Sequence, residues 1–199
     1  MRLAPGSFRV AAIPFGIGLL AALIGVWPVT AVGLILTIAV FGFYRDPTRT
    51  PAGVGIVAPA DGVITEISRR DDELHIVTFL NVHHVHVIRA PTMGEIDGVE
   101  PVAGTRRPAF LGGAESNAGI EVAAGAWTVM MRAGFLARRV TAYVEEGELI
   151  DRGDRLGHIA FGSRVDLFLP SSVTPADLTI RVGDRVYAGQ TIIADGESQ

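Results

Sequence analysis

Residues 10–44 read VAAIPFGIGLLAALIGVWPVTAVGLILTIAVFGFY, and none of their side chains is charged. A helix that covers a soluble core would show a polar stripe at 3.6-residue spacing, and this stretch shows none. The motif GVWP at 25–28 combines residues typical of a turn. Each half, 10–26 and 29–44, is shorter than the ~20 residues that cross a bilayer comfortably. We therefore predict a hydrophobic helical hairpin over residues 1–44, which dips into one membrane leaflet or forms two thin spans.

Arginines flank the apolar stretch on both sides. Arg2 and Arg9 precede it, and Arg45 and Arg49 follow it. Because basic flanks stay on the cytoplasmic side, both ends are expected at the cytoplasmic face of the cell membrane. A signal peptide explains the stretch less well, since the apolar character continues far beyond 15 residues without a clear cleavage site.

The composition excludes several classes of function. Only 19% of the residues are charged, against about 25% in a typical soluble domain, and the deficit lies mainly in residues 10–44. The net charge is −4 and no lysine- or arginine-rich run occurs, which argues against a nucleic-acid partner. The absence of cysteine excludes disulfides, thiolate metal sites and a cysteine nucleophile.

Residues 45–199 have the pattern of short strands separated by glycine turns. The best strand candidates are 62–67, 75–79, 128–131 and 140–144. Two motifs echo each other, DRGDRLG at 151–157 and RVGDRVYAG at 181–189, and they resemble the turns of biotinyl and lipoyl carrier modules. The chain has no lysine that could carry such a group. We predict a mainly β domain over 45–199, a small barrel or sandwich with biotinyl-like barrel-sandwich elements.

Three histidines fall within four residues in the motif NVHHVHV at 81–87. On a continuous strand His84 and His86 would share a face, whereas on a helical turn His83 and His86 would align. Imidazoles offer general acid–base chemistry near neutral pH, or metal ligation. No H-E-x-x-H pattern supplies further ligands, so we predict no metal site.

Two further segments combine a turn pattern with reactive groups. Asp61 lies in the motif PADG, which is typical of a turn, although its carboxylate could instead orient an imidazole. Gly162 and Ser163 are also compatible with a turn. Alternatively, the serine hydroxyl could attack the preceding carbonyl, because glycine has no Cβ to obstruct that approach. His158 lies close by and is interpreted as a surface strand residue rather than an auxiliary base.

Taken together, these segments resemble the short bacterial and archaeal form of phosphatidylserine decarboxylase. The resemblance rests on four segments that follow in order: FYRDPTR at 43–49, PADG at 59–62, H-x-x-H at 83–86 and FGS at 161–163. They cover most of the chain, and a hydrophobic segment precedes them, as expected for an enzyme that meets a lipid at the bilayer surface.

The resemblance implies a proenzyme that cuts itself between Gly162 and Ser163. Ser163 would become a covalent pyruvoyl group, the cofactor that accepts electrons when phosphatidylserine is converted to phosphatidylethanolamine. By analogy, His86 is the base, Asp61 orients it, and His83 acts in substrate binding or proton transfer. The implied partners are phospholipid and the membrane surface. The large and small chains are expected to stay associated, and a homo-oligomer is compatible with the sequence.

Two alternative functions follow from the same residues. The hairpin and the repeated glycine turns also fit a membrane-anchored β-module without catalytic activity. That reading gives no reason for Asp61, the histidines and Gly162-Ser163 to occur together. Short-form relatives can also act on archaeal serine ether lipids, which carry the same headgroup.

Overall fold

A computed structural model describes residues 2–51, 53–105, 116–134, 140–160 and 163–195. By their internal contacts, the residues form two compact units, Met1–Thr48 and Arg49–Gln199. The sequence-based boundary was placed after residue 44, and the role expected of each part stays a prediction.

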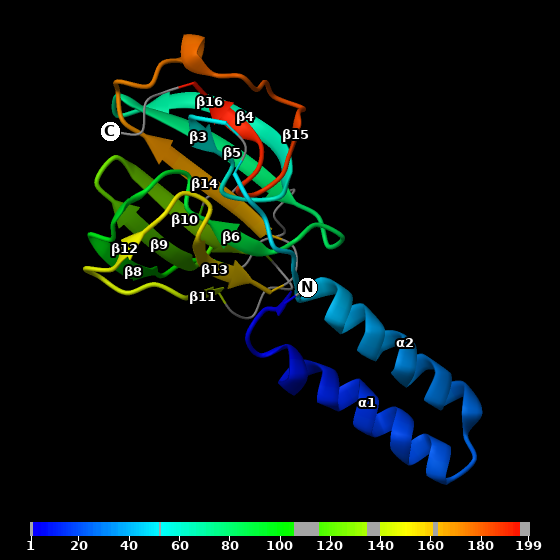
Figure 1. Cartoon of the computed structure of the whole chain (residues 1–199). Coiled ribbons are helices and arrows are strands. Elements are labelled where there is room, and N and C mark those ends of the chain that lie inside the picture. The colour runs from blue at the N-terminus through cyan, green and yellow to red at the C-terminus, as the bar shows by residue number, and fades with distance from the viewer. Residues whose placement is uncertain (1, 52, 106–115, 135–139, 161–162, 196–199) are drawn as a thin grey trace. The chain divides into compact units, whose positions relative to one another are not determined.

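The first unit contains two helices and a short strand pair (Figure 1). Its elements are β1 (Arg2–Leu3), α1 (Ser7–Leu23), α2 (Trp27–Phe43) and β2 (Arg45–Asp46). The turn between the helices contains Gly25 at φ +77°, a backbone conformation that favours glycine. Pro28 lies in the first turn of α2, where its missing N–H leaves no hydrogen bond unmade. Because β1 pairs antiparallel with β2, the two ends of this unit lie side by side.

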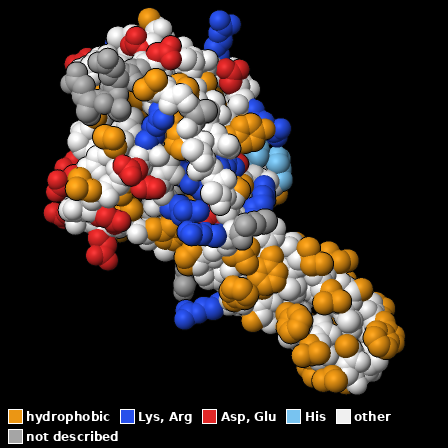
Figure 2. All heavy atoms as spheres, viewed as in Figure 1, with side chains coloured by type: hydrophobic (Ala, Val, Ile, Leu, Met, Phe, Trp, Pro, Cys, Tyr) orange, Lys and Arg blue, Asp and Glu red, His pale blue; other side chains and the backbone are white. Residues whose placement is uncertain are grey.

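The two helices approach most closely at a pair of glycines. A Cβ added to Gly33 would lie 2.7 Å from the Cα of Gly18 and 2.7 Å from the carbonyl oxygen of Pro14. Small residues allow this close backbone contact. Large apolar side chains are exposed along both helices, Phe8, Leu20 and Ile35 among them, and Figure 2 shows hydrophobic side chains gathered there.

Within the described residues, neither helix is long and apolar enough to cross a membrane.

The regular secondary structure described for the second unit consists of strands and one short 3-10 helix, η2 (Pro175–Asp177). The strands are β3 (Ile56–Val57), β4 (Gly62–Arg70), β5 (Glu73–Leu80), β6 (Val87–Arg89), β7 (Gly94–Glu95), β8 (Gly98–Val102), β9 (Gly119–Ala124), β10 (Trp127–Ala133), β11 (Val140–Ala142), β12 (Leu149–Ile150), β13 (Arg155–Ile159), β14 (Ser163–Leu169), β15 (Arg185–Val186) and β16 (Ile192–Ala194). Each of the four predicted strands is present, three of them longer than expected.

The largest sheet has seven strands in the order β15-β4-β5-β14-β10-β9-β8, and all neighbours are antiparallel. Side chains on one face form the hydrophobic core, among them Ile76, Val129, Met131, Val165 and Leu167. The alternation of a strand explains this, since every second residue points to the same face. Smaller sheets, β11-β13-β6, β12-β7 and β16-β3, complete the unit.

The two echoing sequence motifs form turns with the same hydrogen bonds. Asp154 Oδ2 accepts from the backbone N–H of Asp151 at 2.9 Å, and Asp184 Oδ2 accepts from that of Arg181 at 2.8 Å. Gly153 and Gly183 have positive φ in the two turns, +87° and +98°. The sequence echo therefore corresponds to a repeated turn in which aspartate bonds local backbone and glycine allows the left-handed conformation.

The prediction of a mainly β fold is confirmed. Among the described residues the end strands β15 and β8 do not pair with each other, so the large sheet does not close into a barrel. The finer expectation of a biotinyl-like barrel-sandwich stays a prediction.

Candidate functional site

The histidine motif forms a turn between β5 and β6. The backbone N–H of His84 donates to the carbonyl of Asn81 at 2.9 Å, and Nδ1 of His84 accepts from the N–H of Asn81 at 3.1 Å. Asn81 Oδ1 also accepts from the N–H of Val82 at 2.7 Å. Asparagine side chains often bond neighbouring backbone in this way, which competes with continuing the strand. The continuous-strand alternative for this motif is therefore excluded.

The three histidines of this turn have different surroundings. His86 is only 2% exposed, and its Nδ1 lies 2.9 Å from the carbonyl oxygen of His84. A carbonyl accepts only, so Nδ1 carries the proton and Nε2 is the basic nitrogen of the neutral ring. His83 is exposed, with its ring centre 4.3 Å from that of the buried His84. That His86 acts as the base stays a prediction.

Strand register brings this turn next to the start of β14. The backbone of Ser163 pairs with Leu80 on β5, directly before the turn, and with Ala133 on β10. Beyond the turn, the carbonyl of His86 accepts from the N–H of Ile159 at 3.1 Å. Leu80 and His86, the residues at either end of the histidine turn, thus contact the chain on both sides of residues 160–162. Phe161 and Gly162 lie outside the described residues, and Ser163 is described by its backbone alone.

Asp61 is buried and holds Arg49. Both carboxylate oxygens accept from the guanidinium, Oδ2 at 2.8 Å from Nη2, and Oδ1 from Nη1. Oδ1 also accepts from the N–H of Ala188 at 2.8 Å, and Arg49 donates to the carbonyl of Ala188 at 2.8 Å. The two side chains are only 7% and 6% exposed. Arg49 was expected as a membrane-flanking charge, but its guanidinium forms a buried ion pair instead.

The turn around Asp61 is bonded to the strand that follows the histidines. The carbonyl of Pro59 accepts from the N–H of Arg89 on β6 at 2.8 Å. Gly62 is required here by close packing rather than by positive φ, since an added Cβ would lie 2.2 Å from the carbonyl oxygen of Phe79. Asp61 thus lies on backbone fixed to both β5 and β6. That Asp61 orients His86 stays a prediction.

His158 is buried, so its interpretation as a surface residue was wrong. It is 6% exposed because β13 is flanked by β11 and β6, and its Nδ1 lies 2.7 Å from the hydroxyl of Tyr143. Burial lowers the pKa of His158, since desolvation disfavours the imidazolium form. A neutral imidazole therefore lies three residues before Phe161.

No group of three or more His, Cys, Asp or Glu side chains that could hold a metal ion occurs within the described parts of the chain.

The Arg49–Asp61 pair should contribute far more to stability than an exposed pair in the same unit. Asp61→Ala leaves a buried arginine charge without its carboxylate, and we expect it to lower the free energy of unfolding by about 3–5 kcal/mol. Glu66→Ala removes the partner of Arg70 from a pair whose side chains are 38% and 48% exposed, and should cost about 0–1 kcal/mol. Urea unfolding of both variants and of their parent, all in an uncut Ser163→Ala background, measures both losses. Equal losses in the two variants would contradict the role assigned to the buried pair.

The lowered pKa of His158 predicts a pH dependence of stability. Unfolding returns the group to its ordinary value of 6.5, so the unfolded chain binds the proton more readily. The stability that the neutral His158 contributes to the free energy of unfolding is therefore fully present above pH 6.5, and it is lost as the pH falls below that value. His158→Gln should show a smaller drop in the urea midpoint on acidification than the wild type, and His83→Gln, at an exposed position, should follow the wild type. Identical acid profiles for wild type and His158→Gln would refute the prediction.

Comparison with known proteins bears directly on these residues. A family model described as phosphatidylserine decarboxylase matches residues 36–194, which include Asp61, His83, His86 and Ser163. A Halobacterium salinarum protein provisionally named archaetidylserine decarboxylase proenzyme is 42% identical over 191 residues, covering 96% of this chain and 97% of its own. The phosphatidylserine decarboxylase proenzyme of Nitratidesulfovibrio vulgaris is 38% identical, covering 87% and 85%. That of Thermobifida fusca is 39% identical, covering 75% and 70%.

Proposed function

The chain belongs to the phosphatidylserine decarboxylase family, and we propose that it cuts itself at Ser163 and then decarboxylates a serine phospholipid. The main support for the proposal is the strand pairing that places Ser163 opposite Leu80, directly before the histidine turn. The histidine turn adjoins this residue through Leu80, and the carbonyl of His86 bonds Ile159 on the other side. A nucleophile, its peptide bond and a basic imidazole are the groups that such self-cleavage needs.

In the proposed self-cleavage, the hydroxyl of Ser163 attacks the carbonyl carbon of Gly162 while Nε2 of His86 takes the hydroxyl proton. The C–N bond breaks, the amine of Ser163 takes a proton, and an ester remains. Loss of the Cα proton of Ser163 and cleavage of its Cβ–O bond then release the Gly162 carboxylate. Residue 163 is left as dehydroalanine, which takes up water and loses ammonia to give the pyruvoyl group. Asp61 is proposed to support His86 in these proton transfers.

The residues around Ser163 fit a pyruvoyl group formed in place. As the first residue of β14, Ser163 is paired through its backbone with Leu80 and Ala133. Once its nitrogen has left as ammonia, the next pairs, Arg164 with Phe79 and with Arg132, would hold the group in place. The chain lacks lysine, so no side chain could bind pyridoxal phosphate as an imine. When present, the pyruvoyl carbonyls would accept the electrons that carbon dioxide leaves behind. His83, on the exposed side of the turn, is proposed to contact the headgroup or move a proton.

The sheet pairing supports continued association of the two proposed chains. After cleavage the small chain would contain β14, β15 and β16, whose partners β5, β10, β4 and β3 all belong to the large chain. Separating the chains would break the central strand out of the large sheet and expose its buried side chains, Val165 and Leu167.

Ser163→Ala tests the self-cleavage. We expect one uncut chain and no release of carbon dioxide from phosphatidylserine vesicles, because the nucleophile and the cofactor precursor are lost together. His86→Ala should also accumulate uncut chain. Ser171→Ala, the same change at an exposed position, should be cut and active as the wild type. Gel analysis and a carbon dioxide assay measure both properties, and a Ser163→Ala protein that still separates into two chains would sink the proposal.

We propose that the two helices of the first unit insert into the cytoplasmic face of the membrane and thereby bring the enzyme to its substrate. Three observations support this: the stretch 10–44 lacks charge, large apolar side chains are exposed on both helices, and β1 pairs with β2. This pairing lets the apolar helices insert while both ends stay on one side.

Charge placed on these helices should release the protein from lipid. A charged side chain at the centre of an inserted helix costs about 3 kcal/mol, so Leu20→Arg combined with Ile35→Arg should strongly reduce flotation with phosphatidylglycerol vesicles. Val182→Arg introduces the same charge at an exposed apolar position of the second unit and should float like the wild type. Unchanged flotation of the double variant would contradict insertion through the helices.

A serine ether lipid is the second candidate substrate, because archaetidylserine appears in the names of the relatives from Halobacterium salinarum and Methanococcoides burtonii. Diacyl and diether lipids differ in their tails and share the serine headgroup, so both suit the proposed chemistry. The repeated glycine turns support the biotinyl-like barrel-sandwich relation, and together with the apolar helices they also fit a membrane-anchored β-module without catalytic activity.

A further inference from the structure

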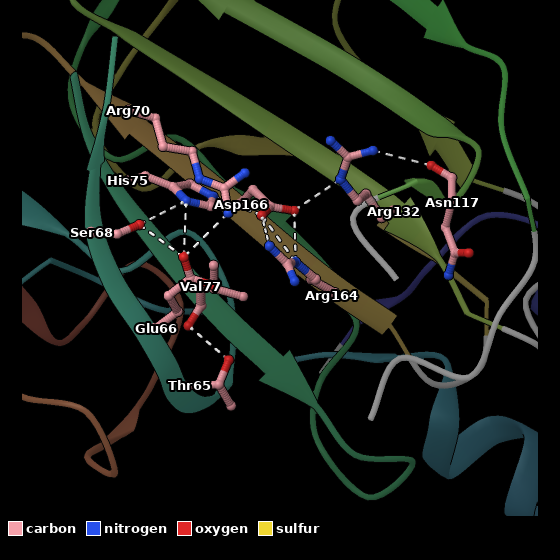
Figure 3. A network of polar contacts seen from close by, with 10 residues as sticks. All are labelled: Thr65, Glu66, Ser68, Arg70, His75, Val77, Asn117, Arg132, Arg164 and Asp166. Carbon is pink, nitrogen blue, oxygen red and sulfur yellow. Dashed lines mark hydrogen bonds and ion pairs between the residues drawn. The ribbon is translucent and has the colours of Figure 1, made fainter. Parts of the chain in front are cut away.

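A cluster of charged side chains lies on the face of the large sheet opposite the hydrophobic core. We call it the Asp166 cluster; it consists of His75, Arg132, Arg164 and Asp166 (Figure 3). The Asp166 carboxylate accepts from Nε2 of His75 at 2.8 Å, from Nη2 of Arg164 at 2.6 Å and from Nε of Arg132 at 3.0 Å. Asp166 is only 1% exposed and His75 is fully buried, so these bonds form away from water.

The cluster joins three adjacent strands and extends from Arg164, near the start of β14, to His75, which pairs with Phe168. His75 lies on β5, Arg132 on β10, and Arg164 and Asp166 on β14. Arg132 and Arg164 are directly opposite each other, and the next pair along the strands is Ala133 with Ser163. The two arginines are thus one residue pair from the proposed cleavage point, while Asp166 lies three residues from Ser163 along β14.

Without Asp166, two like charges would face each other at this position. Like charges directly opposite on antiparallel strands destabilise the pairing, and burial strengthens the repulsion. Burial alone would raise the pKa of Asp166, but the hydrogen bonds from His75 and Arg164 and the charges of both arginines lower it to about 2. The carboxylate therefore stays ionised between the two guanidinium groups. Arg132 also donates to the carbonyl of Asn117 at 3.1 Å, which fixes its direction.

We propose that Asp166 is a positioning residue, which holds Arg132 and Arg164 together and so keeps the Ser163 end of β14 in register with β5 and β10. The inference rests on the proposed self-cleavage. Before cleavage this register would set the geometry of the 162–163 peptide bond. After it, His75 and Arg132 would belong to the large chain and Arg164 and Asp166 to the small chain. The same carboxylate would then hold the new chain end where the lipid reacts.

Asp166→Asn tests the proposal, since it keeps the shape of the side chain and removes its charge. We expect cleavage of newly synthesised chain to slow at least tenfold. In the fraction that is cut, kcat should fall at least tenfold while KM for the lipid changes less than about twofold. Glu66→Gln is the control: its carboxylate approaches the cluster only at Nδ1 of His75, 3.8 Å away, and it should cleave and turn over as the wild type.

A second substitution separates charge repulsion from general loss of structure. Adding Arg132→Met to Asp166→Asn removes one of the two facing charges and keeps an apolar stem in its place. If the proposal holds, this double variant recovers cleavage and kcat to within a few-fold of the wild type. A double variant as slow as Asp166→Asn overturns the proposal, as does an Asp166→Asn protein that cleaves and turns over normally.

Hydrogen exchange on uncut chain gives a readout that does not depend on activity. In a Ser163→Ala background, Asp166→Asn should raise amide exchange at least tenfold over residues 163–166 and far less over 167–169, and Arg132→Met should reverse the rise. Unchanged or uniformly raised exchange would overturn the positioning role. If the exchange rates change as expected but the wild-type protein is never cut, Asp166 holds the register and the proposed self-cleavage is wrong.

Discussion

The hydrogen bonding of β14 on both edges is the constraint on which the arrangement of the site depends. From Ser163 to Leu169 this strand pairs with β5 on one side, and from Ser163 to Phe168 with β10 on the other. Its first residue is therefore fixed relative to the turn that follows β5. A cut before that residue, with loss of its amide nitrogen, would leave the strand pairs from Arg164 onward in place. Self-cleavage at the start of a central strand can thus create a reactive chain end without dismantling the sheet.

Two buried carboxylates, Asp61 and Asp166, stabilise the surroundings of this strand, and each is bound by arginine. Arginine suits these positions because its planar group donates in several directions at once. Arg49 bonds both Asp61 and the carbonyl of Ala188, and Arg132 bonds both Asp166 and the carbonyl of Asn117. Since the chain contains no lysine, every such contact uses a guanidinium. Each arginine therefore joins a buried carboxylate to a backbone carbonyl and holds that stretch of backbone in place. The proposed cleavage depends on such fixed backbone, because the peptide bond itself reacts.

The sequence predicted the class of fold and the position of the strands well, because alternation of apolar residues and glycine turns are local signals. It also indicated that the histidine motif could depart from a strand, and the turn at Asn81 bears this out. It failed for His158, whose burial depends on neighbouring strands from distant parts of the chain. Arg49 and Asp166 were missed because their partners, too, lie in other segments of the chain. Arg49 pairs with Asp61, 12 residues further on, through loop segments outside the strands, and Asp166 bonds His75, 91 residues away, across the register of β14 with β5.

We propose that the chain becomes two chains at Ser163, with a pyruvoyl group at the start of the second. Intact mass spectrometry of the purified wild-type protein tests this most directly. Self-cleavage predicts two species under denaturing conditions, residues 1–162 with a free carboxylate and residues 163–199 carrying a pyruvoyl group in place of an amino-terminal serine. A single full-length species, or a small chain that begins with an intact serine, would contradict it.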